Sequence, residues 1–223
     1  TAHTYVYASS SSGTGQSNSD KSIGDFWMSD GAYTAATKRS SLIHVPLVAA
    51  PIAILHNLPA KTTLNLSAAT VAGIFGGTIT RWNDPAIVAD NNRSTTKTIY
   101  KLDKNGNPAK DAKGNPVVLR TQVIQGRYTL PNQPIKVVYR SDSSGTSENF
   151  TNYLNKSAGS VWTKSKNKVF KDSFPGNIND VANLGRVVGA ASSTGVSQLA
   201  GKTPYSITYA EVNYAAANKL KIA

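Results

Sequence analysis

The chain has 223 residues and carries 24 Lys and Arg against 12 Asp and Glu, which gives a formal net charge of +12. This length fits one large domain or two small ones, and the positive charge favours anionic partners such as phosphate, nucleic acid, teichoic acid or acidic lipid headgroups. Because the sequence has no cysteine, disulfide scaffolds, Cys-ligated zinc, iron–sulfur clusters and thiol nucleophiles are excluded. The longest apolar run, residues 45–55, is shorter than the roughly 20 residues of a membrane-spanning helix. No signal peptide opens the sequence, so we expect a cytosolic protein or the mature or trimmed part of an exported one.

The first part of the sequence predicts short strands around a small-residue loop. Residues 4–8 and 23–28 are rich in β-branched and aromatic residues, which favour strands. The serine- and glycine-rich residues 9–15 are typical of a flexible linker, but their Gly-x-Gly spacing also suits a backbone that approaches an anion closely. The nearly continuous apolar stretch over residues 42–55 predicts a strand buried on both faces, as in a parallel sheet.

The middle of the sequence predicts two helices followed by an insertion. Ser67 is a favourable N-cap for a helix over residues 68–75, which two glycines end. Pro85 suits the first turn of another helix. Residues 93–130 are rich in Lys, Thr and Asn and contain two Asn/Gly turn signals. They predict an inserted, solvated β-hairpin.

The last part of the sequence alternates strands with helices. The expected elements are a strand over residues 135–139, a helix behind Thr146, a loop over 155–177, a helix over 180–188, a helix opening at 193–195, a strand over 206–209 and a helix over 211–219. This alternation indicates α/β architecture.

One segment between a strand and a helix carries the clearest chemistry. A helix N-terminus leaves about four N–H groups without intrahelical partners and carries partial positive charge, and Ser144, Gly145 and Thr146 fall at that point. Arg140 can offer a planar pair of donors to an oxyanion, and Asp142 is placed to hold the guanidinium. Together these residues predict a site for a phosphate-type anion. Taken alone, the same segment also fits an ordinary helix cap beside a surface Arg–Asp pair.

Several blocks of the sequence follow one another in a recognisable order. They are residues 11–15, 25–30, 71–87 and 137–154, with a weaker match at 195–196 and 205–211. The most specific is Arg-x-Asp-x-Ser-Gly-Thr at residues 140–146, followed by Phe-Thr-x-Tyr-Leu at 150–154. In these blocks the chain resembles the phosphate-binding proteins of high-affinity ABC-type phosphate importers.

The resemblance implies an α/β fold of the type II periplasmic-binding-protein kind, in which two α/β domains enclose a ligand cleft and close by a hinge. We expect residues 1–55 to form part of the first domain, 56–215 the second domain with the inserted hairpin at about 93–130, and 216–223 a C-terminal tail. The first domain would be incomplete, because the family has an earlier strand and loop and a later return segment. Those pieces would sit on another chain, be lost by proteolysis, or lie outside the printed sequence.

The resemblance also implies two phosphate ligands near the N-terminus. Ser12 would donate its hydroxyl from a loop shaped by Gly13, with Ser11 as the neighbouring alternative. Asp30 would accept a hydrogen bond from the phosphate's own proton, and Ser29 is the weaker candidate beside it. Because phosphate keeps a proton at neutral pH and sulfate does not, this carboxylate would select phosphate.

The remaining implied ligands lie in the segment between the strand and the helix. Arg140 would pair with phosphate and with Asp142. Ser144, Gly145 and Thr146 would supply donors at the start of the helix.

The function implied by the resemblance is capture of inorganic phosphate outside the cytoplasm, in the periplasm or at the cell surface, for an ABC-type permease in the membrane. No catalysis and no cofactor are expected, since no P-loop or nucleophile-elbow string occurs. No metal is expected either, because His3, His44 and His56 lack metal-ligand spacing. Nucleic acid is not an expected partner, because the basic residues are not interleaved with stacking aromatics.

Three features favour an alternative. The first domain is incomplete, Trp27 stands where the family usually has a small residue, and the 93–130 insertion has no counterpart in compact members. They favour a surface or adhesive module that kept the scaffold but binds phosphate weakly or not at all. A different oxyanion is a third interpretation, although Asp30 argues against fully ionised ones such as sulfate.

Overall fold

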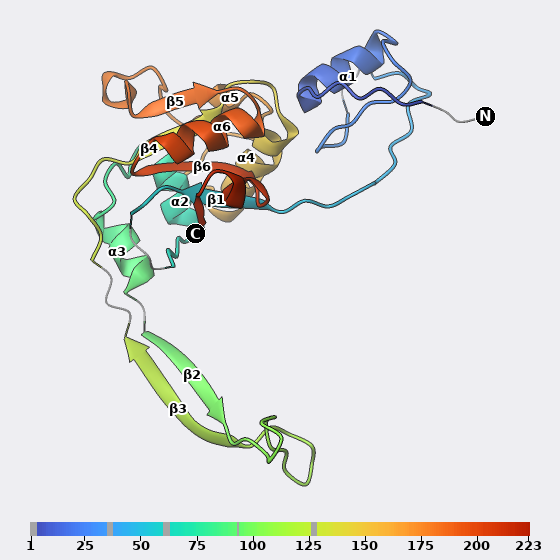
Figure 1. The fold of residues 1–223 in the computed structure, drawn as a ribbon. Helices are drawn as coiled ribbons and strands as arrows, with labels where there is room; N and C mark the ends of the chain where they lie inside the picture. Colours follow the sequence, from blue (N-terminus) through green and yellow to red (C-terminus); the bar gives the residue numbers. More distant parts are fainter. Residues whose placement is uncertain (1–3, 35–37, 60–62, 93, 126–128) are drawn as a thin grey trace.

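The computed structural model describes residues 4–34, 38–59, 63–92, 94–125 and 129–223. It has a body around a five-stranded sheet, an N-terminal segment with helix α1 (Ser12–Asp20), and a two-stranded arm that projects from the body (Figure 1). No helix within these ranges is long and apolar enough to cross a membrane.

The sheet of the body has the strand order β5-β4-β6-β1-β7. Its strands are β1 (Ile52–His56), β4 (Lys136–Arg140), β5 (Val187–Ala190), β6 (Ser206–Glu211) and β7 (Lys221–Ile222). β4 lies parallel to β5 and β6, whereas β1 runs antiparallel to β6 and β7. This mixed sheet with its covering helices confirms the predicted α/β class.

Alternation along the strands separates two hydrophobic cores, because successive side chains of a strand point to opposite faces. Val137 and Tyr139 lie in an aromatic core with Phe75 of α2 (Ala68–Phe75) and Phe150 of α4 (Gly145–Ser157). Val138, between them, belongs to a second, smaller core under α6 (Ser192–Lys202). Helices therefore cover both faces of the sheet.

The helices with strong local signals form where the sequence predicts them. Ser67 caps α2, and its hydroxyl accepts a hydrogen bond from the Thr70 N–H at 3.3 Å. Asp84 caps α3 (Pro85–Asn91), with the proline in the first turn. The helix behind Thr146, the helix at 193–195 and the strands at 135–139 and 206–209 are likewise confirmed as α4, α6, β4 and β6.

The N-terminal predictions are wrong in three places. Residues 4–8 and 23–28 are irregular and form no strand. The expected loop over residues 9–15 enters helix α1 at Ser12, with Ser11 as the N-cap. The apolar stretch 42–55 becomes a strand only from Ile52, and that strand is antiparallel to its neighbours. β-branched and aromatic composition favours a strand only where the segment pairs with a partner strand, and residues 4–8 and 23–28 pair with no strand among the described residues.

Three C-terminal predictions also differ from the structure. The helix expected over residues 180–188 is one turn of 3₁₀ helix (Val181–Asn183) followed by β5. The expected loop 155–177 contains the end of α4 and the short helix α5 (Phe170–Ser173). The helix expected over 211–219 shrinks to α7 (Tyr214–Ala217), and β7 follows it. Pairing of β5 with β4 and of β7 with β1 overrides the local helical preference in the first and third of these segments.

The inserted hairpin is confirmed as the projecting arm. Its strands β2 (Ser94–Tyr100) and β3 (Val118–Gln125) pair antiparallel from Ser94 opposite Gln125 to Tyr100 opposite Val118. Residues 93 and 126–128, at the ends of the predicted insertion, lie outside the described residues.

Candidate anion-binding site

The candidate site begins at the carboxyl end of β4, where the chain turns into α4. Ser144 is the N-cap of α4, and its hydroxyl accepts hydrogen bonds from the N–H groups of Thr146 at 3.1 Å and Ser147 at 3.4 Å. The Ser144 N–H is itself held by the Lys168 carbonyl at 3.0 Å. The helix start is therefore fixed from both sides, with its positive end at the edge of the sheet.

Arg140 lies buried at the end of β4, with its guanidinium clamped by Asp142. Its Nε and Nη2 donate to the two oxygens of Asp142 at 2.8 and 2.6 Å, and its Nη1 donates to the Ser193 hydroxyl at 2.9 Å. The backbone N–H of Arg140 donates to the Tyr209 hydroxyl at 3.2 Å. The bonds from the side chain to Asp142 and Ser193 use three of the five N–H groups of the guanidinium. Two N–H groups therefore remain to meet an oxyanion.

The pair is held in its charged form. Burial acts to raise the pKa of the Asp142 carboxyl, but hydrogen bonds from Arg140 and from the Ser192 N–H outweigh it and hold that pKa below its usual value. Burial acts to lower the pKa of Arg140, and the bonds to Asp142 and its charge outweigh this too, so the pKa is raised. A permanent cation thus stands beside the start of α4.

Ser12 and Asp30 come from the N-terminal segment and meet Thr146 at the start of α4. The Ser12 hydroxyl lies 3.4 Å from the Asp30 Oδ2 and accepts the Asp30 N–H at 3.3 Å. The Thr146 hydroxyl lies 3.2 Å from the same Oδ2 and 2.7 Å from the Glu211 Oε1. Ser12, Asp30 and Thr146 are therefore far apart in the sequence but in contact in the structure.

Gly145 is required by this close approach. A Cβ at this position would lie 2.8 Å from the Asp30 Cβ and 2.9 Å from the Ser12 Oγ. Gly13 makes a second close contact, in which its N–H donates to the Ser143 carbonyl at 3.2 Å. The N-terminal segment and the start of α4 thus touch backbone to backbone.

Further polar contacts seat the N-terminal segment on the body. The Asn149 side chain donates to the Asp30 carbonyl at 3.1 Å. Lys168 donates to the Gln16 side-chain carbonyl, and its ammonium lies 5.6 Å from the centre of the Tyr33 ring. These contacts fix the N-terminal segment against α4 and the loop that follows it.

The two neighbouring candidates have local partners. Ser11 caps α1, and its hydroxyl accepts the Thr14 N–H at 3.2 Å. The Ser29 hydroxyl donates to the Gly31 carbonyl at 2.8 Å and accepts from Gln16 at 3.0 Å. Both therefore hold the N-terminal segment together, and Ser12 and Asp30 are the residues that reach α4.

Sequence reasoning missed three residues at the site: Ser193, Tyr209 and Glu211. Ser193 lies at the start of α6 and Tyr209 and Glu211 lie on β6. The Tyr209 hydroxyl also bonds the Ser147 hydroxyl at 2.7 Å, and burial raises the pKa of Tyr209 above its usual value, which keeps it neutral. The signal was available in part, because a parallel β6 beside β4 brings its carboxyl end to the same edge of the sheet.

The described residues contain no cluster of three or more His, Cys, Asp or Glu side chains that could hold a metal ion. His3 lies outside the described residues. His56 is buried beside Trp82, with their ring centres 6.2 Å apart, and His44 accepts the Tyr33 N–H. The candidate site is thus one of hydroxyls, backbone N–H groups, a guanidinium and carboxylates.

Comparison with known proteins decides the family. Residues 2–223 match the sequence model of the PBP superfamily domain. The chain belongs to this superfamily. Among curated proteins, phosphate-binding protein PstS 3 of Mycobacterium tuberculosis is 33% identical over 227 residues, which take in 99% of this chain and 49% of that protein. Phosphate-binding protein PstS of Pasteurella multocida is 30% identical over 217 residues, covering 96% of this chain and 50% of that protein.

A solved structure shares the fold of this PBP superfamily member. The crystal structure of an ancestral soluble variant of the human phosphate binding protein superposes with a TM-score of 0.57 at 26% identity, over 84% of this chain and 42% of that one. These findings confirm the resemblance drawn from the sequence. The chain spans about half the length of the curated relatives it matches.

Proposed function

We propose that this chain captures inorganic phosphate outside the cytoplasm and presents it to an ABC-type permease. The observation that carries the proposal is the convergence of Ser12, Asp30 and Thr146 at the start of α4. Thr146 in turn bonds Glu211, whose charge also acts on the nearby Arg140. The relatives named above are phosphate-binding proteins, which supports the same ligand for this chain.

Each group has a role suited to a protonated oxyanion. Arg140 contributes its remaining N–H groups, Ser12 and Ser144 their hydroxyls, and Gly145 its backbone N–H at the positive end of α4. The Thr146 hydroxyl would turn from Glu211 to donate to the anion. Asp30 accepts from the proton that phosphate keeps at neutral pH, whereas it repels sulfate. Charge-assisted hydrogen bonds contribute about 1.5–3 kcal/mol each. Several of them reach the roughly −8 kcal/mol of micromolar binding after the costs of association.

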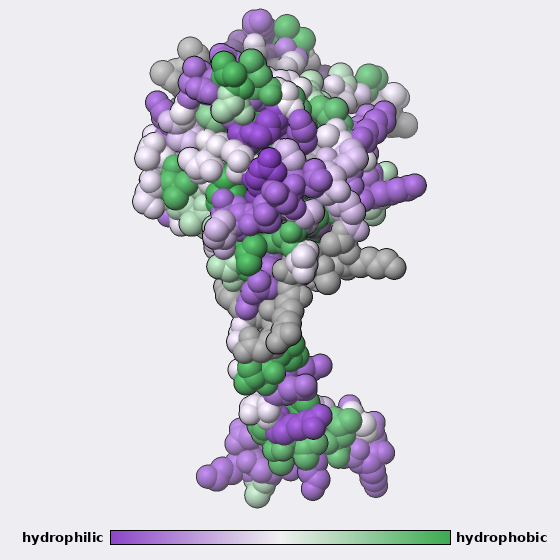
Figure 2. Space-filling model, turned by 90° about the vertical axis from the view of Figure 1, so that its left-hand side faces the viewer, coloured by the Kyte–Doolittle hydropathy of each residue, from purple (hydrophilic) through white to green (hydrophobic). Residues whose placement is uncertain are grey.

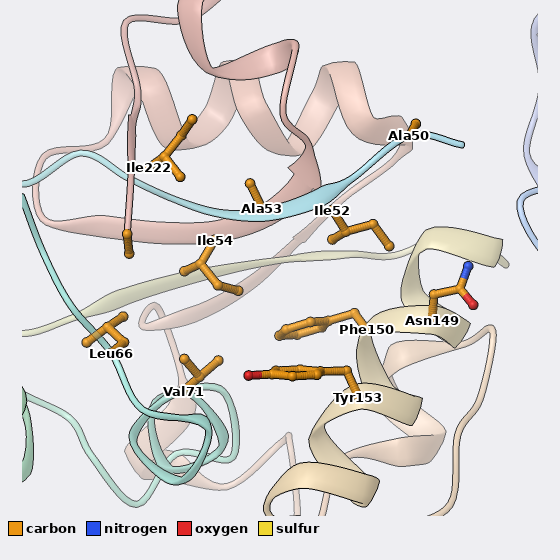
Figure 3. Close-up of a pocket in the computed structure, with 11 residues that line it drawn as sticks. Ala50, Ile52, Ala53, Ile54, Leu66, Val71, Asn149, Phe150, Tyr153 and Ile222 are labelled. Carbon is orange, nitrogen blue, oxygen red and sulfur yellow. The ribbon is translucent and has the colours of Figure 1, made fainter. Parts of the chain in front are cut away.

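We also propose a two-domain division, with residues 1–51 in the first domain and the body in the second. The expected boundary after residue 55 and the expected tail 216–223 are adjusted, because residues 52–55 lie in β1 and Lys221–Ile222 form β7 of the body sheet. A groove of about 630 Å³ lies between β1, α2, α4 and β7 (Figure 3). It is an argument that a further segment packs there and completes the first domain. Side chains of Ile52, Ile54, Val71, Phe150, Tyr153 and Ile222 line it. The preceding residues 42–50 are irregular and expose large apolar side chains, such as Val48 at 88%. A segment from a longer form of the protein or from another chain would cover this surface.

A surface-attachment module with weak or lost phosphate binding is the second candidate. The projecting β2–β3 arm favours it, because capture of a small anion by α4 and the N-terminal segment makes no use of that arm. The two candidates differ in one property, which is the affinity of the chain for phosphate.

Isothermal titration of the 223-residue chain with phosphate, and separately with sulfate, tests the proposal. We expect phosphate to bind and sulfate to give no heat. Arg140→Ala removes the buried cation and is expected to weaken phosphate binding at least about 100-fold. Arg81→Ala is the matched control, since Arg81 is an exposed arginine that bonds Asn132 far from the site. Equal affinities in both variants would overturn the site, and silence of the wild-type chain would favour the second candidate.

A further inference from the structure

The arm, residues 94–125, presents positive charge that it does not neutralise itself. Its cations are Lys97, Lys101, Lys104, Lys110, Lys113 and Arg120, and its carboxylates are Asp103 and Asp111. Both carboxylates bind the arm's own backbone: Asp103 accepts the N–H groups of Asn105 and Asn107, and Asp111 those of Lys113 and Asn115, all at 2.8–3.0 Å. Among the described residues the ion pairs are Arg140–Asp142 and Lys166–Glu148, and neither lies in the arm. The lysines of the arm therefore face solvent as a cationic cluster.

Apolar side chains are exposed among these cations. Tyr100, Leu102, Val118 and Leu119 are 40%, 59%, 51% and 62% exposed. Tyr100 pairs with Val118 across the ribbon, and an irregularity in the register between Ile99 and Tyr100 leaves Leu119 beside them. Figure 2 shows hydrophobic and hydrophilic residues intermixed at the far end of the arm, away from the body.

The register gives the ribbon two unlike faces. Because paired residues share a face and successive pairs alternate, one face carries Thr98, Thr121, Tyr100 and Val118, with Thr96 and Val123 next along. All six of these residues are uncharged. Lys97 and Arg120 belong to pairs on the opposite face. The charged side chains of the paired strands therefore lie on one face, which also carries Ile99 and Ile124, and the other face is uncharged.

We propose that the arm docks this protein onto a lipid bilayer with anionic headgroups. Lys101, Lys104, Lys110 and Lys113 would contact the headgroup phosphates, while the apolar side chains at Leu102 and Leu119 would enter the interface. Cationic charge attracts a segment to an anionic leaflet, and buried apolar area adds to the binding. Docking is independent of whether phosphate occupies the site at α4.

The same observations disfavour other occupants. A hydrated polyanion would match the charge but would leave Leu102 and Leu119 in water. A second copy of the chain would place two sets of six cations against each other, which is unfavourable. An isolated two-stranded ribbon is itself only marginally stable in water, so a surface that covers its exposed apolar side chains would stabilise it.

Co-sedimentation of the 223-residue chain with vesicles tests the proposal. We expect binding to vesicles of phosphatidylcholine with phosphatidylglycerol, none to pure phosphatidylcholine, and weakening as salt is raised. The variant Lys101→Gln, Lys104→Gln, Lys110→Gln, Lys113→Gln is expected to lose at least about 100-fold in affinity. The matched control changes Lys156, Lys164, Lys171 and Lys202, which are exposed on the body, to Gln and removes the same charge. It is expected to lose less than about fivefold.

The contribution of apolar side chains to vesicle binding can be measured separately. Leu102→Ser with Leu119→Ser is expected to weaken vesicle binding about tenfold or more. Because the chain has no cysteine, Leu119→Cys can be labelled at one place with a polarity-sensitive dye, and Lys171→Cys provides the control label. The dye at residue 119 is expected to brighten on anionic vesicles, and the dye at 171 to stay unchanged.

Four outcomes would overturn the proposal. The first is that the wild-type chain does not sediment with anionic vesicles, and the second is that the arm and body lysine variants lose vesicle affinity equally. The third is that the dye at residue 119 does not respond to vesicles. The fourth is that a soluble polyanion fully displaces the chain from vesicles while the leucine changes have no effect on binding. The last of these would mean that the arm recognises charge alone.

Discussion

The hydroxyl of Thr146 lies 3.2 Å from the carboxylate of Asp30, a residue 116 positions earlier in the chain. The same hydroxyl lies 2.7 Å from Glu211, and a single hydroxyl proton serves one acceptor well at a time. The shorter distance favours Glu211 as that acceptor. The contacts of Asp30 with Thr146 and with Ser12, at 3.2 and 3.4 Å, are long. Asp30 therefore keeps acceptor capacity next to the start of α4, which is where a protonated anion would need it.

Asp30→Asn should change which anion binds. The amide cannot repel a fully ionised anion and can donate a hydrogen bond to it, so we expect the preference for phosphate over sulfate to fall about tenfold or more. Titration of the variant with both anions measures this ratio. Asp172→Asn removes an exposed carboxylate of α5 and should leave the ratio unchanged. A ratio in Asp30→Asn equal to that of the wild-type chain would exclude a role for this carboxylate in selection.

Gly145→Ala should weaken phosphate binding without destabilising the body. The added Cβ would lie 2.8 Å from the Asp30 Cβ and 3.1 Å from the Gly31 N, so the N-terminal segment must move away from α4. The helix itself tolerates alanine well. We expect at least about tenfold weaker binding in a titration, with the urea midpoint unchanged or slightly raised. Gly195→Ala in α6 is the control, because the nearest atom to its added Cβ would be 3.6 Å away. Gly106 is not suitable, because its φ of +81° would strain an alanine. Unchanged binding in Gly145→Ala would show that the close approach is not needed.

The sequence predicted the elements whose signals are local. Ser67 and Asp84 cap their helices through bonds to N–H groups within three residues, so a short window contains the whole cause. The strands expected at residues 4–8 and 23–28 failed for the opposite reason. A strand depends on a partner edge elsewhere in the chain, and composition alone does not say whether one exists.

The candidate site divides in the same way. Arg140, Asp142 and Ser144 could be predicted from their spacing, because a strand followed by a capped helix places them together. Ser12 and Asp30 came from the resemblance, since nothing local ties them to α4. Tyr209 and Glu211 were missed because their place beside Arg140 depends on β6 pairing parallel with β4, which no short window contains.

Trp82→Ala should be among the most destabilising changes in the body. Trp82 is fully buried, and its indole N–H donates to the Tyr205 carbonyl at 3.0 Å. Loss of the ring leaves a cavity and an unpaired carbonyl, so we expect the free energy of unfolding to fall by about 3–5 kcal/mol. Urea unfolding followed by circular dichroism measures it. Trp27→Ala, in the N-terminal segment, should cost less than about 1 kcal/mol. Similar losses in the two variants would contradict the assignment of the core.

His56 should make the stability of the body depend on pH. Its side chain is buried, and its Nδ1 accepts the Leu58 N–H at 3.3 Å. Burial, with the positive charge of Lys221 as the second cause, lowers the pKa of His56 from 6.5 to about 4. The unfolded chain therefore takes up a proton near pH 6.5, whereas the folded chain does so only near pH 4. Between these values the unfolded state holds more protons, so the free energy of unfolding rises with pH.

The size of this dependence follows from the shift, since each pKa unit corresponds to about 1.4 kcal/mol. We expect the contribution of the neutral imidazole, on the order of 3–4 kcal/mol, to be present above about pH 6.5 and to be lost as pH falls toward 4. Urea unfolding is measured at intervals from about pH 5 to 7.5, where carboxylates stay ionised and histidines are the side chains that titrate. His56→Asn keeps an acceptor near the Leu58 N–H but cannot take up the proton, so its unfolding free energy should be nearly flat over this range. A slope in His56→Asn as steep as that of the wild-type chain would assign the pH dependence to another group.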